Sequence, residues 1–216
     1  QSIPLIQFGV FDGPSSLNLE NSSYSISSFV SDWDETRYKE AFDQVLAYIE
    51  AGDIYQANLT FSLFADFEGD PWTFYKDLQL KQKVKHGAFV DLDSEISILS
   101  RSPELFFKTD SKMNISTRPM KGTQPRDRDV EKDKKNLKFL KNDIKNRAEN
   151  LMIVDLLRND ISRISKVGTV KVPELYKVET YETVHQMTSL IIGEMNKKTT
   201  VAELFAALFP CGSITG

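Results

Sequence analysis

A lysine in the middle of this 216-residue chain has the neighbours that a nucleophile needs. Lys121 follows a predicted strand and a proline in Thr117–Thr123, and Gly122 comes directly after it. A desolvated lysine presents a neutral amine that can attack an electrophilic carbon, and glycine allows close backbone approach. A lysine at a tight turn is more often a surface residue. Taken alone, the stretch leaves both interpretations open.

Two glutamates have a comparable setting. Glu104 stands at the head of the apolar run Leu105–Phe107. If it points into a cleft, burial raises its pKa and suits it to proton transfer, whereas an edge residue would face water. Glu149 lies in an apolar helical stretch, where a lone glutamate usually forms a salt bridge. A hard cation such as Mg²⁺ nevertheless takes only one or two carboxylates from many proteins.

Two further residues were weighed for chemistry. His185, one of two histidines, suits either a hydrogen-bonded core position or a site position. Cys211 has no second cysteine or histidine at metal-ligand spacing, so a zinc site is not predicted. Gly52–Leu59 sets polar residues inside an apolar segment, but by itself it gives little reason to expect catalysis.

The elements that must position these residues follow from apolar spacing. Glu104 and Lys121 belong to a predicted antiparallel meander, whose strands are Gly87–Leu92, Glu95–Ser100, Glu104–Lys108 and Met113–Arg118. Lys121 is expected at the turn after the last of these strands. Glu149 lies on one long predicted helix, densely charged and solvated over 127–148 and apolar through Leu157.

The remaining elements complete an α+β pattern. A helix over 34–51 has Asp34 as N-cap and Gly52 as its stop signal, and a second helix begins at Pro71. A final helix covers Val201–Phe209. Additional strands are predicted at Ile54–Phe67, Thr169–Val172 and Met187–Ile192.

Composition excludes several classes of function. The net charge of −4 disfavours a partner with a phosphate backbone or an anionic membrane surface, so neither nucleic acid nor membrane is expected. One cysteine rules out an internal disulfide framework and agrees with a cytoplasmic location. The sequence contains no P-loop, dinucleotide-binding fingerprint, nucleophile elbow or zincin motif.

Seven stretches occur in an order that resembles the chorismate-binding enzyme family, which includes the aminodeoxychorismate, anthranilate, isochorismate and salicylate synthases. They are GDIYQANLT, SRSPELFF, TRPMKGT, RAENLMIVDLLRNDISR, VKVPELY, VHQMTS and FPCGSITG. The resemblance covers about Trp33 to Gly216. Within the family, anthranilate synthases usually have Ala where Lys121 stands. Lys121 therefore indicates the aminodeoxychorismate synthase component I branch, with Met120 replacing its usual Ile.

The resemblance implies a role for each candidate residue. Lys121 would attack C2 of the chorismate ring, and Glu104 would be the general acid for the departing C4 hydroxyl. Glu149 would bind Mg²⁺ together with the substrate carboxylate. Thr123, His185 and Ser213 would contact the substrate. Ammonia from a glutamine amidotransferase subunit would then give 4-amino-4-deoxychorismate, for 4-aminobenzoate and folate synthesis.

The resemblance also implies an architecture: a large, mostly antiparallel, β-sandwich-like core flanked by helices. Residues 1–30 are expected to be a leader or remnant, and 31–216 an incomplete catalytic domain without the C-terminal part that carries a second Mg²⁺ carboxylate. Two alternatives stay open. One is anthranilate synthase component I or another chorismate-utilising enzyme. The other is an inactive fragment or a subunit that docks the amidotransferase.

Overall fold

The computed structural model describes residues 12–16, 22–81, 83–92 and 96–215. Its helices are α1 (Glu35–Ala51), α2 (Pro71–Lys81), α3 (Val130–Asn142), α4 (Ile144–Ser162), α5 (Val201–Leu208) and α6 (Gly212–Thr215). Its strands are β1 (Tyr24–Ile26), β2 (Val30–Ser31), β3 (Leu63–Phe64), β4 (Phe67–Gly69), β5 (His86–Leu92), β6 (Ile96–Ser102), β7 (Leu105–Thr109), β8 (Asn114–Arg118), β9 (Met120–Pro125), β10 (Lys171–Thr180) and β11 (Val184–Glu194). The predicted α+β class with antiparallel strands is confirmed.

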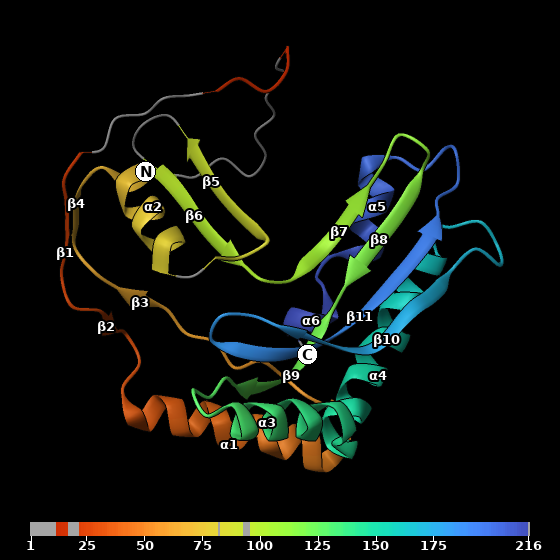
Figure 1. The fold of residues 1–216 in the computed structure, drawn as a ribbon, viewed down its shortest axis with the longest axis horizontal. Helices are drawn as coiled ribbons and strands as arrows, with labels where there is room; N and C mark the ends of the chain where they lie inside the picture. Colours follow the sequence, from red (N-terminus) through yellow and green to blue (C-terminus); the bar gives the residue numbers. More distant parts are fainter. Residues whose placement is uncertain (1–11, 17–21, 82, 93–95, 216) are drawn as a thin grey trace.

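The main sheet has the order β10-β11-β8-β7, and β9 pairs with β11 beyond the end of β8. All of its pairings are antiparallel. Pro119 separates β8 from β9, since proline has no N–H for the ladder. The hairpin of β5 and β6 lies beside α2, away from the main sheet (Figure 1). The predicted meander is therefore confirmed, but it is divided between two sheets.

The core lies between the main sheet and the helices α4 and α5 (Figure 1). Ile115 and Ile191 face it from β8 and β11 and are 1% and 0% exposed. Ile153, Leu157 and Ile161 lie on successive turns of α4 and are at most 2% exposed. This packing fixes α4, which carries Glu149, against the strand that pairs with the segment containing Lys121.

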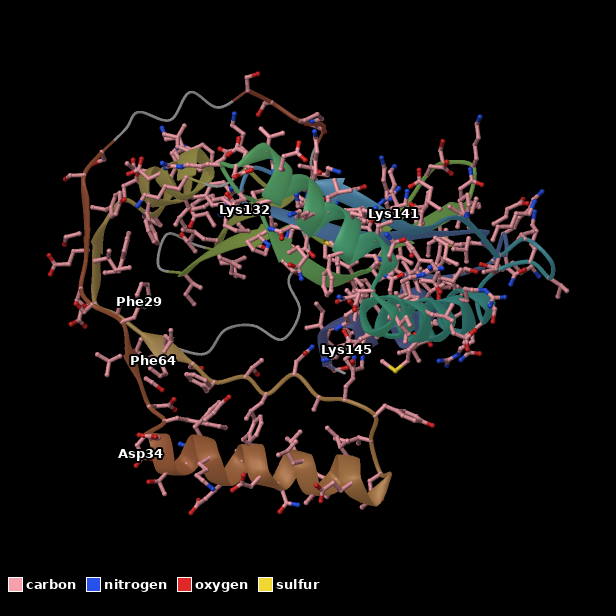
Figure 2. The ribbon with its side chains drawn as sticks, turned by 60° about the horizontal axis from the view of Figure 1, so that its bottom comes forward. Phe29, Asp34, Phe64, Lys132, Lys141 and Lys145 are labelled. Atoms are coloured by element: carbon pink, nitrogen blue, oxygen red, sulfur yellow. The ribbon has the colours of Figure 1, made fainter. Side chains whose placement is uncertain are left out.

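Helix α1 has the predicted caps. The Asp34 carboxylate accepts from the N–H of Arg37, and Gly52 ends the helix at φ 81°. None of its residues is buried, and its apolar face, which includes Phe42 and Leu46, is exposed. Figure 2 shows α1, with its N-cap Asp34, apart from the helices that carry Lys132, Lys141 and Lys145.

Several sequence predictions were wrong in detail. The strand predicted over 54–67 is present only as β3 and the start of β4. Residues 54–62 run irregularly, and within them Asn58 donates its backbone N–H to Thr215 of α6. The single long helix is divided at Asp143, which ends α3 and caps α4 through its carboxylate. Lys121 lies inside β9 rather than at a turn. The strands β10 and β11 are also longer than predicted.

Two predicted helices are confirmed, and two other predictions are not tested by the structure. The short helix from Pro71 and the final helix are confirmed, the latter with a capping box between Thr200 and Glu203. The boundary predicted at residue 30 stays a prediction. It falls within β2, which pairs with β3, while β1 before it pairs with β4. Residue 95, the predicted start of a strand, lies outside the described residues.

Candidate active site

Lys121 is presented by a β-bulge. Lys121 and Gly122 of β9 stand opposite the single residue Met187 of β11, because the pairing register shifts by one residue there. Gly122 has φ 93°, and a Cβ at this position would lie 2.8 Å from Oδ1 of Asn146. A bulge re-aims the side chains around it. Glycine is therefore required beside the lysine for conformation and for space.

Ser213 connects Lys121 to Glu104. Nζ of Lys121 donates to the carbonyl oxygen of Ser213 at 3.1 Å. The hydroxyl of the same serine donates to Oε1 of Glu104. The backbone N–H of Met120 also donates to that oxygen, at 3.4 Å. We call Glu104, Lys121 and Ser213 the catalytic cluster. The structure thus brings together three of the predicted site residues from β9, α6 and the connection between β6 and β7.

Burial controls the protonation of Glu104. Desolvation raises its pKa above the usual glutamate value, while the Ser213 hydroxyl, the Met120 N–H and the charge of Lys121 oppose that rise. A cavity of about 380 Å³ lies against this carboxyl, with largely apolar walls that include Phe106 and Ile214. This direction agrees with the rise expected for a Glu104 that faces a cleft. A carboxyl with a raised pKa keeps its proton to a higher pH than an ordinary glutamate and can donate it to a leaving group.

Thr123 lies two residues beyond Lys121 on β9. Its hydroxyl donates to Oε1 of Gln186 at 3.0 Å, and the two residues are directly opposed in the β9–β11 register. Successive side chains of a strand point to opposite faces of a sheet. His185 therefore points away from the face that Thr123 and Gln186 share.

His185 is enclosed by protein groups. It is 1% exposed, with Nε2 3.0 Å from Oδ1 of Asp133 and Nδ1 3.0 Å from Oγ1 of Thr180. The Arg126 guanidinium, above all, holds the pKa of Asp133 at about 2. Asp133 is therefore a charged anchor for the imidazole. The structure does not group His185 with Thr123, and its predicted contact with substrate stays a prediction.

Glu149 is the candidate for a hard cation. Its side chain is 40% exposed, and its ion-pair partner is Lys145 at 3.9 Å. The carboxylate oxygens are thus available, and oxygen donors of this type fit Mg²⁺. No group of three or more His, Cys, Asp or Glu side chains that could hold a metal occurs among the described residues.

Two residues of the site were missed by sequence reasoning. Gln186 was overlooked beside its histidine neighbour, although alternation along a strand would have paired it with Thr123. Asn58 was passed over in the Gly52–Leu59 motif. Its backbone N–H donates to the Thr215 carbonyl at 3.2 Å, and its side-chain amide donates to the Ile214 carbonyl. The sequence feature that could have identified Asn58 is its position as a polar residue within an apolar segment.

Comparison with known proteins shows which family the chain resembles. The model of a family described as chorismate binding enzyme matches residues 10–216. Aminodeoxychorismate synthase component 1 of Escherichia coli (strain K12) is 43% identical over 193 residues, which are 88% of this chain and 42% of that protein. Anthranilate synthase component 1 of Saccharolobus solfataricus is 36% identical over 191 residues, covering 87% of this chain and 45% of that protein.

A solved structure shares the same arrangement. Anthranilate synthase component I from Streptococcus pneumoniae TIGR4 superposes with a TM-score of 0.77 at 28% identity, over 88% of this chain and 41% of that one. The chain thus spans about two fifths of the length of these relatives. Among the described residues, no helix has the length and apolar character needed to cross a membrane.

Proposed function

Because the chain belongs to the chorismate-binding enzyme family, we propose that its protein converts chorismate and ammonia to 4-amino-4-deoxychorismate. The observation that carries the proposal is the catalytic cluster: a lysine amine and a partly buried carboxyl are held by one serine, Ser213. The sequence relatives named aminodeoxychorismate synthase component 1 support the choice of reaction, since they reach 43% identity against 36% for the anthranilate synthase.

The proposed chemistry has two displacements. After the loss of its proton, the Lys121 amine can donate one N–H to the Ser213 carbonyl and keep its lone pair free to attack C2 of the ring. Both ring double bonds shift, from C1=C2 and C5=C6 to C1=C6 and C4=C5, as the C4–O bond breaks. The protonated Glu104 gives its proton to the leaving hydroxyl, which departs as water. Ammonia then attacks C4 and expels the lysine amine, and the new ammonium group returns a proton to Glu104.

The raised pKa of Glu104 suits the first displacement, because the carboxyl must carry a proton when the C4–O bond breaks. Thr123 is proposed to orient the substrate from β9, and Ser213 to hold both reacting groups. His185 is proposed to support the pocket from the opposite face of the sheet. In this proposal Lys121 and Glu104 take part in the reaction, and the other residues position the substrate or the reacting groups.

Mg²⁺ and an ammonia-supplying partner belong to the same proposal. Glu149 would hold Mg²⁺, which when bound neutralises the substrate carboxylate and orients the ring. A glutamine amidotransferase subunit would supply ammonia, in agreement with the words "component 1" in the names of the relatives. A cytoplasmic location is proposed on the single unpaired cysteine of the sequence.

The test is product analysis on the whole protein with chorismate, ammonium chloride and MgCl₂. The proposal expects 4-amino-4-deoxychorismate by chromatography and no pyruvate in a coupled assay. The Lys121→Ala variant should lose this product, whereas Lys134→Ala should not, because Lys134 is an exposed lysine of α3 paired with Glu131. Anthranilate with release of pyruvate would instead establish the alternative activity. Turnover by neither route would favour a docking or inactive role.

A further inference from the structure

Helix α6 carries Ser213 but cannot hold itself in place. It has four residues, a single turn, and a helix this short has no stability of its own in water. Its position must therefore come from contacts with other elements. One such contact is at Gly212, where an added Cβ would lie 2.2 Å from Cδ2 of Leu156 on α4. This close approach fixes the start of α6 against α4.

Asn58 holds the other end of α6. Its backbone N–H donates to the carbonyl of Thr215 at 3.2 Å, and its side-chain amide donates to the carbonyl of Ile214. The last carbonyls of a helix have no partner within the helix and need donors from elsewhere. Asn58 supplies two such donors from a segment more than 150 positions earlier in the chain.

The position of α6 determines the geometry of the catalytic cluster. The Ser213 carbonyl accepts from Lys121, and its hydroxyl donates to Glu104. A rotation of this single turn would move both groups of Ser213 at once, because they belong to one residue. The Ile214 carbonyl that Asn58 binds is in the next residue along the turn.

We propose that Asn58 is a positioning residue that acts through Ser213, locking α6 so that one serine aligns Lys121 and Glu104. The kinetic part of this inference depends on the proposed amination, whereas the placement of Ser213 does not. Asn58 has no described contact with Lys121 or Glu104, so its effect on them must pass through α6.

The first test measures amination by Asn58→Ala in the whole protein. This variant removes the side-chain donor and keeps the backbone N–H. A misaligned cluster should lower kcat by about 10- to 100-fold, while KM changes by less than about three-fold because ground-state binding is retained. The matched control is Asn142→Ala, which removes an asparagine amide bonded to a backbone carbonyl at 2.8 Å in α3. It should leave kcat unchanged.

The second test is independent of turnover. The carboxyl titration of Glu104 is followed by NMR in protein labelled with ¹³C at glutamate, and the signal is assigned by its absence in Glu104→Gln. Loss of the Ser213 hydroxyl bond should raise the titration midpoint in Asn58→Ala and leave it unmoved in Asn142→Ala. In a Ser213→Ala background, Asn58→Ala should produce no further rise.

Each outcome decides the proposal. An unmoved Glu104 midpoint in Asn58→Ala, or an equal rise without the Ser213 hydroxyl, would overturn it. If the unmodified protein makes no 4-amino-4-deoxychorismate, the proposed function fails and the NMR measurement still decides the role of Asn58. Asn58→Asp, which keeps the side-chain shape and removes the donor, replaces Asn58→Ala if that variant does not fold. If neither variant folds, Asn58 is a structural residue and the proposal is rejected.

Discussion

Replacing Gly122 with alanine tests the bulge that presents Lys121. The residue has φ 93°, and alanine in a left-handed conformation costs about 1–2 kcal/mol. The new Cβ would also lie 2.8 Å from Oδ1 of Asn146 and 3.0 Å from Cδ1 of Leu140. Neither neighbour moves easily, since Leu140 is fully buried and the Asn146 amide is tied to Asp143 at 2.8 Å. Overpacking of this kind costs about 1–3 kcal/mol more.

The matched control is Gly168→Ala. Gly168 has φ 81°, and an added Cβ would have no neighbour within 4 Å. Gly168→Ala should lower the free energy of unfolding only by the conformational cost of alanine, about 1–2 kcal/mol. Gly122→Ala should lower it by roughly 2–5 kcal/mol. The loss of unfolded-state entropy is the same in both variants and cancels in the comparison.

Urea unfolding of both variants measures the difference. Gly122→Ala should have the lower midpoint, and it should also lose amination activity because the bulge carries Lys121. Gly168→Ala should keep that activity. Equal midpoints for the two variants would refute the reasoning, because Gly122 would then have space for a side chain.

Three more predictions concern the core and two carboxyl groups. Ile161→Ala, at a fully buried position, should cost roughly 2–5 kcal/mol in urea unfolding, whereas Ile144→Ala, 85% exposed, should cost less than about 0.5 kcal/mol. The raised pKa of Glu104 means that the folded state binds this proton more tightly than the unfolded state. The free energy of unfolding should therefore fall as pH rises from the ordinary to the raised pKa. Urea midpoints measured across pH should show this fall in the unmodified protein and not in Glu104→Gln. The lowered pKa of Asp133 contributes stability that is lost as pH falls from 3.8 to about 2, and a variant Asp133→Asn that showed the same loss in acid titration would contradict this assignment.

Local signals in the sequence predicted some elements well. Asp34 and Gly52 mark the ends of α1 because a cap depends on one side chain and one backbone conformation. Asp143 was not recognised as a break, because it sits in a charged run where one more aspartate is unremarkable. The apolar period continues across it, so periodicity alone predicts a single helix.

The site was predicted residue by residue but not as an arrangement. Lys121 and Glu104 were both proposed from their sequence context, and a rise in the Glu104 pKa was expected only if its side chain faced a cleft. Their connection through Ser213 was not, since Ser213 lies 109 positions from Glu104. Strand register decides which side chains share a face, and sequence spacing does not contain it. His185 was therefore preferred over Gln186, although the register pairs Gln186 with Thr123.

The most direct test of the account is a search for the covalent intermediate. The whole protein is incubated with chorismate and MgCl₂ without ammonia, digested, and examined by mass spectrometry. The account predicts an adduct of chorismate less water on the peptide that contains Lys121, absent in Lys121→Ala and retained in Lys134→Ala. Amination by Lys121→Ala at the rate of the unmodified protein would contradict the account.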